Sequence, residues 1–145
     1  MDKITQFQGE YRWLSNFSDC NVFLEGILYP SVENAYQAAK TTNKEERIQF
    51  ETCSAGQAKR SSKNITMRKD WPEVKKQVMF NLLCQKFNKE PYITLLLDTK
   101  LVDIEEGNTW GDTYWGIDLR SGRGQNILGK MIMNIRLDIL FWKYL

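Results

Sequence analysis

The stretch of residues 29–40, YPSVENAYQAAK, constrains the local fold more than any other part of the chain. Pro30 fixes its own φ angle and ends the extended run before it, and Ser31 is a favoured residue type at the N-cap of a helix. Three alanines follow within the next nine residues, and alanine has the highest helix propensity of all residues. The pattern therefore predicts a helix over residues 31–40.

One side of this predicted helix carries an acid, an amide and a base. Glu33, Gln37 and Lys40 are spaced i, i+4 and i+7, which places them within roughly 60° of arc on a helix. The adjoining side is apolar, and its small residues allow other backbone to approach closely. Two interpretations follow: an amphipathic helix whose polar side is simply solvated, or a helix that presents these three groups to a site.

Composition limits the size and class of the protein. With 145 residues the chain is long enough for one domain with a hydrophobic core, so we expect a single domain over residues 1–145. Hydrophobic residues make up 42% and charged residues 26%, as in ordinary soluble proteins, and the net charge of +2 provides no general basic field. No apolar run approaches the roughly 20 residues that cross a bilayer, and no signal peptide is apparent. We therefore expect no membrane partner and a cytoplasmic location.

The chain contains no histidine, which restricts the chemistry open to it. Ser-His-Asp and Cys-His catalysis and His-ligated zinc are excluded. The three cysteines are scattered without a C-x-x-C pair, which indicates reduced thiols. If the protein is an enzyme, then carboxylates, lysine, arginine or tyrosine must move the protons.

Hydrophobic periodicity and turn residues predict an α+β fold that is mostly helical with a small β-sheet. A hairpin is expected around Glu25 and Gly26, and the N-terminal strands are expected to share one sheet with residues 101–104. Helices are expected over residues 31–40, 43–52, 54–63, 70–87 and 92–98, with a last helix that begins near residue 126.

Three residues are expected to cap these helices, and one apolar stripe is expected on the last of them. The predicted caps are Asn43, in a capping box with Glu46, then Asp70 and Asn126. The stripe consists of Leu128, Met131, Ile132, Ile135, Ile139 and Trp142.

Residues 105–124 form a long predicted loop, and a loop of this length in a compact domain is usually functional or disordered. Trp110 and Trp115 argue against disorder, and Asp112 places a carboxylate between them. Gly124 and Asn126 lead into the last helix, where free N–H groups favour an anion such as phosphate. Each feature also has a plainer interpretation, a turn anchored by a buried tryptophan or an ordinary glycine-rich loop.

The cations Arg60 and Arg68 also have two interpretations, a solvated charge run or a phosphate site. Taken together, the acids, cations and loop aromatics suit a nucleotide-like ligand, because rings stack on indoles and phosphates meet arginine. For cleavage of a glycosidic bond, carboxylates are the expected groups, since positive charge develops on the sugar. For hydrolysis of a glycosidic bond by carboxylates, we expect neither a metal nor another cofactor.

Several short motifs follow one another over about residues 7–140. They are LSNF at 14–17, YPS at 29–31, Glu33, Gln37, Ala38, Lys40, Ala58, Arg60, RKDW at 68–71, KF at 86–87, NTWGD at 108–112, WG at 115–116, GRGQN at 122–126, Leu128, Gly129 and Arg136. Each motif is weak alone, but their shared order and spacing are specific, and the set resembles the NADAR (YbiA-like) family. One departure is Asn34, where many members have histidine after the glutamate.

The resemblance implies a YbiA-like fold and an N-glycosidase that acts on ribosyl compounds. The family is associated with phosphorylated ribosylamino-pyrimidine intermediates of riboflavin synthesis and with removal of ADP-ribose from guanine in nucleic acid. The expected partners are therefore a ribose-phosphate or ADP-ribosyl substrate, ADP-ribosylated nucleic acid included. The competing expectation is a non-catalytic ADP-ribose or nucleotide-binding module. Substrate and oligomeric state stay open.

The resemblance and the patterns above lead to one set of predicted site residues. Glu33 and Asp112 are expected to stabilise the sugar cation, activate water or bind ribose hydroxyls, without an assignment of which does which. Lys40 is a candidate for attack on C1 of an opened ribose, or for a plain electrostatic contact. The expected substrate-binding residues are Asn16, Phe17, Gln37, Arg60, Arg68, Trp71, Trp110, Trp115, Gly124 and Asn126.

Overall fold

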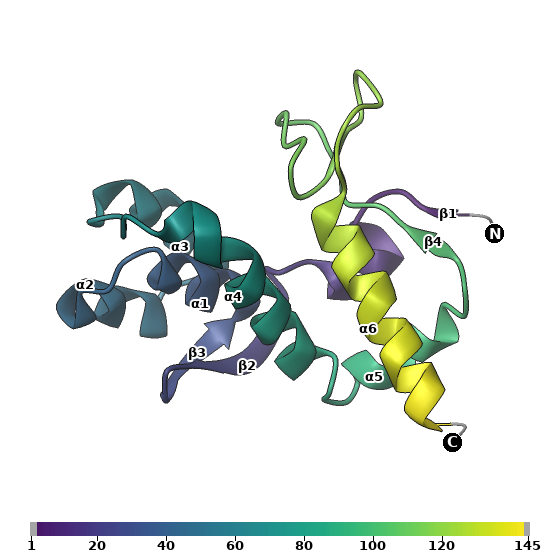
Figure 1. Ribbon diagram of the computed structural model, residues 1–145, viewed down its shortest axis with the longest axis horizontal. Coiled ribbons are helices and arrows are strands. Elements are labelled where there is room, and N and C mark those ends of the chain that lie inside the picture. The colour runs from purple at the N-terminus through teal and green to yellow at the C-terminus, as the bar shows by residue number, and fades with distance from the viewer. Residues whose placement is uncertain (1–2, 144–145) are drawn as a thin grey trace. The chain divides into compact units, whose positions relative to one another are not determined.

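The computed structural model describes the backbone of residues 3–143 and the side chains of residues 3–142. The chain divides into two compact units (Figure 1). One is the continuous segment Asn16–Asn88, and the other combines Met1–Ser15 with Lys89–Leu145. The expectation of a single domain over residues 1–145 stays a prediction.

The continuous unit holds a hairpin followed by helices. Its elements are β2 (Asp19–Leu24), β3 (Ile27–Ser31), α1 (Val32–Ala39), α2 (Lys44–Ile48), the 3-10 turn η2 (Gln49–Glu51), α3 (Ala55–Ser61), η3 (Ser62–Asn64) and α4 (Trp71–Lys86). The strands β2 and β3 pair antiparallel, and the turn between them uses positive φ angles at Glu25 and Gly26, as predicted.

The second unit holds short strands and two helices. Its elements are β1 (Lys3–Ile4), η1 (Gly9–Leu14), α5 (Tyr92–Asp98), β4 (Asp103–Ile104), β5 (Gly107–Asn108), β6 (Ile117–Asp118) and α6 (Ile127–Lys143). The strands form two parallel pairs, β1 with β4 and β5 with β6.

The predicted α+β, mostly helical class is confirmed, but the sheet differs from the prediction. Residues 3–4 do pair with the 101–104 segment through β1 and β4. The hairpin forms a separate two-stranded sheet, and a third pair lies inside the segment predicted to be a long loop. These strands are two residues long, too short for a period-2 pattern to reveal them.

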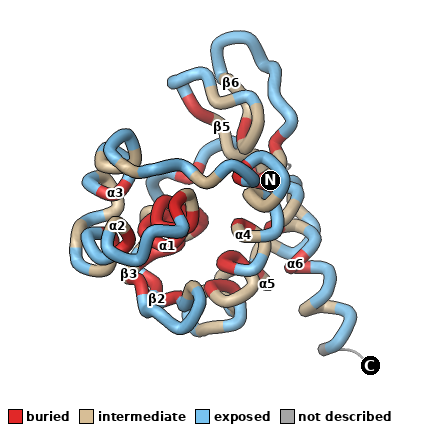
Figure 2. Tube along the Cα trace, turned by 60° about the vertical axis from the view of Figure 1, so that its left-hand side comes forward, coloured by how far each residue is buried: buried red, intermediate tan, exposed pale blue. Residues whose placement is uncertain are grey.

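Helix α1 is the core of the continuous unit. All eight of its residues are buried, polar ones included (Figure 2). The hairpin, α3 and α4 contact it, as the arrangement around α1 in Figure 1 shows. The interpretation of a solvated polar side is therefore wrong for Glu33 and Gln37, because neighbouring elements cover the face that carries them.

Helix capping follows the prediction at some positions only. Ser31 accepts a hydrogen bond from the Asn34 N–H at 3.0 Å, as predicted, and Asn43 accepts from the N–H groups of Glu45 and Glu46. The Glu46 side chain does not make the predicted return bond to the N-cap. Its carboxylate accepts hydrogen bonds from the Thr41 and Thr66 hydroxyls instead. A larger side-chain network outweighs the local motif there.

The other two predicted caps and the apolar stripe also need correction. Asp70 occupies the N-cap position of α4 without a side-chain capping bond, because its carboxylate pairs with Arg68. The side chain of Asn126 bonds to β4 and the segment after it. On α6 the stripe is buried at Leu128, Ile132 and Ile135, but Trp142 is 72% exposed.

Within the part of the chain that is described, no helix is long and apolar enough to cross a bilayer.

Candidate functional site

A buried carboxyl group lies at the start of α1. Glu33 is only 8% exposed, and its Oε2 accepts a hydrogen bond from the Gln37 Nε2 at 2.5 Å, one helical turn later. The Glu33 backbone N–H donates to the Asn16 carbonyl at 3.0 Å. The predicted i, i+4 pair is thus a direct contact, and Asn16 joins it from the segment before β2.

The electrostatics of this carboxyl group are unusual. Burial raises the pKa of Glu33, while the Gln37 hydrogen bond and the nearby charges of Lys59 and Lys40 act against that rise. Burial also lowers the pKa of Lys40, the charge of Glu33 acts to raise it, and Lys59 and Lys75 lower it further. The two pKa values therefore move toward each other, which is a common property of groups that exchange protons with a ligand.

Two aromatic rings stand beside Lys40. Its Nζ lies 5.4 Å from the centroid of the Tyr36 ring, a cation–π distance. Tyr36 in turn packs against Trp71, with ring centroids 5.1 Å apart at 59°. Trp71 is 6% exposed, so one part of its ring serves the packing of α4 on α1. The predicted role of Trp71 in substrate binding stays a prediction.

Hydrogen bonds to other segments fix both ends of α1. At the N-terminal end, Asn34 accepts from the Ser31 hydroxyl and donates to the carbonyls of Phe50 (2.9 Å) and Cys53 (2.8 Å). The Asn34 amide therefore performs a structural task. At the other end, Arg47 is buried, and its Nε donates to the carbonyls of Ala38 and Thr41.

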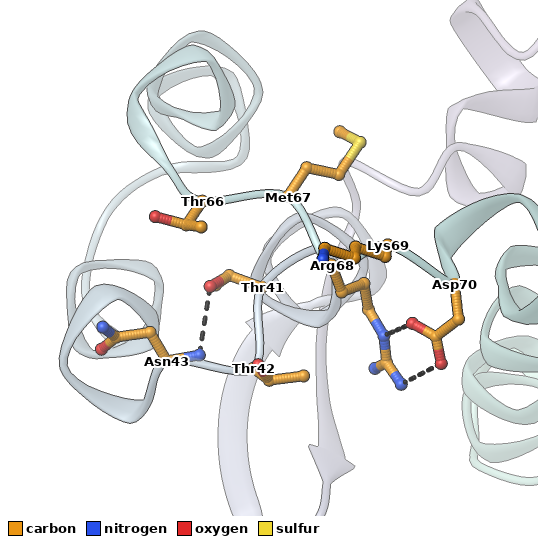
Figure 3. Close-up of a pocket in the computed structure, with 8 residues that line it drawn as sticks. All are labelled: Thr41, Thr42, Asn43, Thr66, Met67, Arg68, Lys69 and Asp70. Carbon is orange, nitrogen blue, oxygen red and sulfur yellow. Dashed lines mark hydrogen bonds and ion pairs between the residues drawn. The ribbon is translucent and has the colours of Figure 1, made fainter.

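Beyond the C-terminal end of α1 lies an open pocket of about 670 Å³ (Figure 3). Most of the residues that line it have hydroxyl, amide or charged side chains: Thr41, Thr42, Asn43, Thr66, Met67, Arg68, Lys69 and Asp70. Arg68 points two N–H groups at the Asp70 carboxylate, at 2.6 and 3.0 Å. A phosphate held by Arg68 would therefore share this guanidinium with Asp70.

The remaining predicted residues of this unit lie at its surface. Arg60 is exposed on α3, and Phe17 is half-buried. The neighbour of Arg60, Lys59, is the cation that influences the pKa values of both Glu33 and Lys40. Sequence reasoning singled out Arg60 and missed Lys59, although the signal was present in the paired cations at the end of α3.

In the second unit, Asp112 forms a local turn. Its Oδ1 accepts from the backbone N–H groups of Tyr114 (3.0 Å) and Trp115 (2.9 Å). The buried Asn108 holds this turn, since its side chain accepts from the Asp112 N–H and donates to the Asp112 carbonyl, both at 2.9 Å. The Asn108 anchor was not predicted. Trp110 is 59% exposed, while Trp115 is half-buried against Tyr114.

Gly124 and Asn126 organise the approach to α6. A Cβ atom at Gly124, where φ is +155°, would collide with the Gly116 carbonyl, so only glycine fits. The Asn126 side chain accepts from the Glu106 N–H at 3.0 Å and donates to the Ile104 carbonyl at 2.9 Å. Both residues have structural tasks here, and their predicted contact with phosphate stays a prediction.

The predicted site residues thus belong to two groups. Asn16, Glu33, Gln37, Lys40 and Trp71 lie on or beside α1, in the same unit as Arg60 and Arg68; Trp110, Asp112, Trp115, Gly124 and Asn126 lie in the other unit. Among residues 3–142, no group of three or more His, Cys, Asp or Glu side chains is arranged to hold a metal ion.

Known proteins resemble this chain over most of its length. The model of the NADAR domain matches residues 4–140. The N-glycosidase YbiA of Shigella boydii is 34% identical over 138 residues, which are 92% of this chain and 85% of that protein. A riboflavin biosynthesis protein of Vibrio vulnificus is 32% identical over 88% of this chain, but the match covers only 35% of that longer protein.

The fold has a solved counterpart. The NMR structure of the Escherichia coli protein YbiA matches with a TM-score of 0.84 and 30% identity, covering 99% of this chain and 88% of that one. The expected YbiA-like fold is therefore confirmed. The expected enzyme class, a hydrolase that acts on N-glycosyl bonds, is supported by the relatives named N-glycosidase. With the motifs around Glu33 and Asp112 and a family model that matches nearly the whole chain, this protein belongs to the NADAR family.

Proposed function

We propose that this protein hydrolyses the C1–N glycosidic bond of a ribose-phosphate ligand. The observation that carries the proposal is the buried Glu33 carboxyl group, hydrogen-bonded to Gln37 and electrostatically coupled to Lys40. Positive charge develops on the sugar ring as such a bond breaks, and a carboxylate in a buried position stabilises that charge more strongly than one in water. The names of the YbiA relatives support the same reaction class.

In the simplest version of the reaction, water adds to C1 and the nitrogen of the base leaves with a proton. Glu33 then acts as the electrostatic stabiliser or as the base that takes a proton from water. In the second version, the Lys40 amine attacks C1 of the opened sugar, the C1–N bond to the base breaks, and the base leaves with a proton. Water then hydrolyses the resulting imine, which frees the Lys40 amine and the sugar. A neutral amine is required for that attack, and burial of Lys40 lowers its pKa in the needed direction.

The substrate that we propose is a phosphorylated ribosylamino-pyrimidine, as in riboflavin synthesis, or ADP-ribose attached to guanine in nucleic acid. The riboflavin biosynthesis relative supports the first of these. Contacts of Arg60, Arg68, Trp71 and Asp112 with such a ligand are proposals that rest on the family motifs. The cytoplasmic location is a separate proposal, which rests on a composition typical of soluble proteins.

The decisive experiment incubates the purified protein with both substrates and measures the released base and ribose phosphate by chromatography and mass spectrometry. Release that depends on wild-type protein and disappears in Glu33→Gln supports the proposal. Tight binding of ADP-ribose without release from either substrate would instead support a non-catalytic binding module.

A further inference from the structure

Two buried side-chain acceptors, one on Gln37 and one on Asn16, have no hydrogen-bond donor among residues 3–142. The Gln37 Oε1 and the Asn16 Oδ1 are both enclosed and lack a donor, and Gln37 as a whole is 4% exposed. Buried side-chain acceptors in folded proteins nearly always have a donor, supplied by protein, water or a ligand. Two unsatisfied acceptors on neighbours of one carboxyl group therefore indicate a missing hydrogen-bond donor.

The orientation of the Gln37 amide has a clear cause. A carboxylate can only accept hydrogen bonds, so Glu33 takes the donor side of the amide, the Nε2, at 2.5 Å. That contact leaves the Oε1 acceptor for another group. Asn16 is tied to the same residue, because its backbone carbonyl accepts the Glu33 N–H at 3.0 Å, while its Nδ2 lies 3.6 Å from the Met79 Sδ.

The chemistry of the proposed ligand restricts which group can supply the donor. Phosphate oxygens are acceptors at neutral pH and cannot satisfy an amide oxygen. Sugar hydroxyls can donate, and so can amino groups of the base. Because Gln37 bonds directly to the carboxyl group that we assign to C1, the hydroxyl on the neighbouring carbon C2 is the sugar donor closest to that position.

We propose that the Gln37 Oε1, assisted by the Asn16 Oδ1, accepts a hydrogen bond from the ribose 2-hydroxyl and selects ribose over 2-deoxyribose. This inference rests on the proposed function. Hydrogen bonds to the 2-hydroxyl of a sugar strengthen as the oxocarbenium-like state forms, so the contact favours turnover as well as binding. A deoxy ligand would leave the buried acceptor unpaired, and sites of this kind reject such ligands strongly.

The test uses binding of two sugar phosphates, so that it does not depend on turnover. Affinities of ribose 5-phosphate and 2-deoxyribose 5-phosphate are measured by titration calorimetry for the wild type, Gln37→Met and Gln77→Met. Methionine keeps the length of glutamine without the amide, and Gln77 is exposed on α4. The wild type and Gln77→Met should prefer ribose about tenfold or more, and Gln37→Met should bind both sugars alike.

Turnover gives a second measurement. With a ribosyl substrate and its 2-deoxy analogue, kcat/KM of the wild type should differ about 100-fold or more, and Gln37→Met should lose most of that difference. Circular dichroism and the melting temperature confirm that each variant is folded. If Gln37→Met does not fold, Asn16→Ala takes its place and should reduce the preference for ribose.

Several outcomes would overturn the inference. They are equal affinity of the wild type for both sugars, no binding of either, or an unchanged preference for ribose in folded Gln37→Met. A preference that follows the amino group of the base instead of the 2-hydroxyl would also overturn it. Absence of base release with a Gln37-dependent preference for ribose would contradict only the proposed function.

Discussion

At the scale of single residues, Glu33 is an ionisable carboxyl group that is almost completely buried. Neighbouring elements remove it from water, and Gln37 provides a hydrogen bond that opposes the resulting rise of its pKa. A carboxyl group kept in this environment reacts more strongly with a developing positive charge than an exposed one. The same burial makes the ionised Glu33 side chain unfavourable for the stability of the fold. Replacing Glu33 should therefore lower activity and raise stability in the same variant.

Glu33→Gln should lower kcat about 100-fold or more, the scale of losing one electrostatic stabiliser, and should raise stability at neutral pH. Because folding raises the pKa of Glu33 above its usual value near 4.5, the folded state binds the proton more tightly than the unfolded chain. That contribution is fully present below pH 4.5 and is lost as the pH rises through the folded-state pKa.

The stability part is checked by melting curves between pH 4 and 8 of wild type, Glu33→Gln and the exposed control Glu10→Gln. Glu33→Gln should melt higher at pH 8, by roughly 2–4 °C for each kcal/mol, and the gain should shrink toward pH 4. A variant that retains half of the wild-type rate would remove Glu33 from the mechanism.

Lys40→Arg separates the two roles proposed for Lys40, covalent attack on the sugar and a plain electrostatic contact. Arginine keeps the positive charge but cannot act as an amine nucleophile, so a covalent mechanism predicts loss of turnover. Borohydride added during turnover of the wild type should then trap a sugar adduct on the peptide that contains Lys40. Lys44→Arg, an exposed change on α2, serves as the control. Substantial turnover in Lys40→Arg without a trapped adduct leaves only the electrostatic role.

At the scale of elements, α1 is short but firmly held. Its eight residues carry Glu33 and Gln37, and the fixed points come from outside the helix, at the Phe50 and Cys53 carbonyls and at the Arg47 guanidinium. A helix of this length is not stable alone in water, so these tertiary contacts determine its position. The positions of Glu33 and Gln37 in the site therefore depend on residues outside the site.

Asn34→Ala should destabilise the fold by roughly 2–6 kcal/mol, because the buried Phe50 carbonyl and the part-buried Cys53 carbonyl lose their donor at about 1–3 kcal/mol each. It should also lower kcat, since α1 loses an N-terminal attachment next to Glu33. Denaturant unfolding measures the stability, with the exposed Asn88→Ala as the matched control. A loss no larger than that of the control would mean that Asn34 does not hold α1.

At the scale of the whole molecule, the chain passes between the two units twice, near residues 15–16 and 88–89. One unit is an uninterrupted segment, and the other contains both ends of the described chain. Units of this size are near the lower limit for an independent hydrophobic core. The family model likewise spans residues 4–140 as one domain.

We therefore predict one cooperative unfolding transition, which Gly129→Ala in one unit and Asn34→Ala in the other both shift. A Cβ atom at Gly129 would collide with the Ile104 carbonyl and the Asn126 side chain, whereas one at Gly56, on α3, meets only the end of Arg60 at 3.4 Å. Gly129→Ala should thus destabilise, and Gly56→Ala should stabilise by about 0.4–1 kcal/mol. Calorimetry that resolves two transitions, each shifted by one variant, would contradict the single domain.

The sequence by itself determined the features that depend on near neighbours in the chain. The Ser31 cap, the hairpin turn at Glu25 and Gly26, and the approximate span of the helices all follow from the preferences of a few adjacent residues. The family motifs are also visible in the sequence, because they consist of residue types at fixed spacing.

The tertiary structure alone decided the burial, the pKa shifts and the hydrogen-bond partners of the predicted site and cap residues. Whether the polar side of α1 meets water or protein depends on the hairpin, α3 and α4, which are distant in sequence. The same holds for Asp70, which pairs with Arg68 rather than capping α4, and for Asn126, which bonds to residues near β4. Spacing along the chain specifies which face a side chain occupies, but burial, pKa and hydrogen-bond partners arise from segments that only the fold brings together.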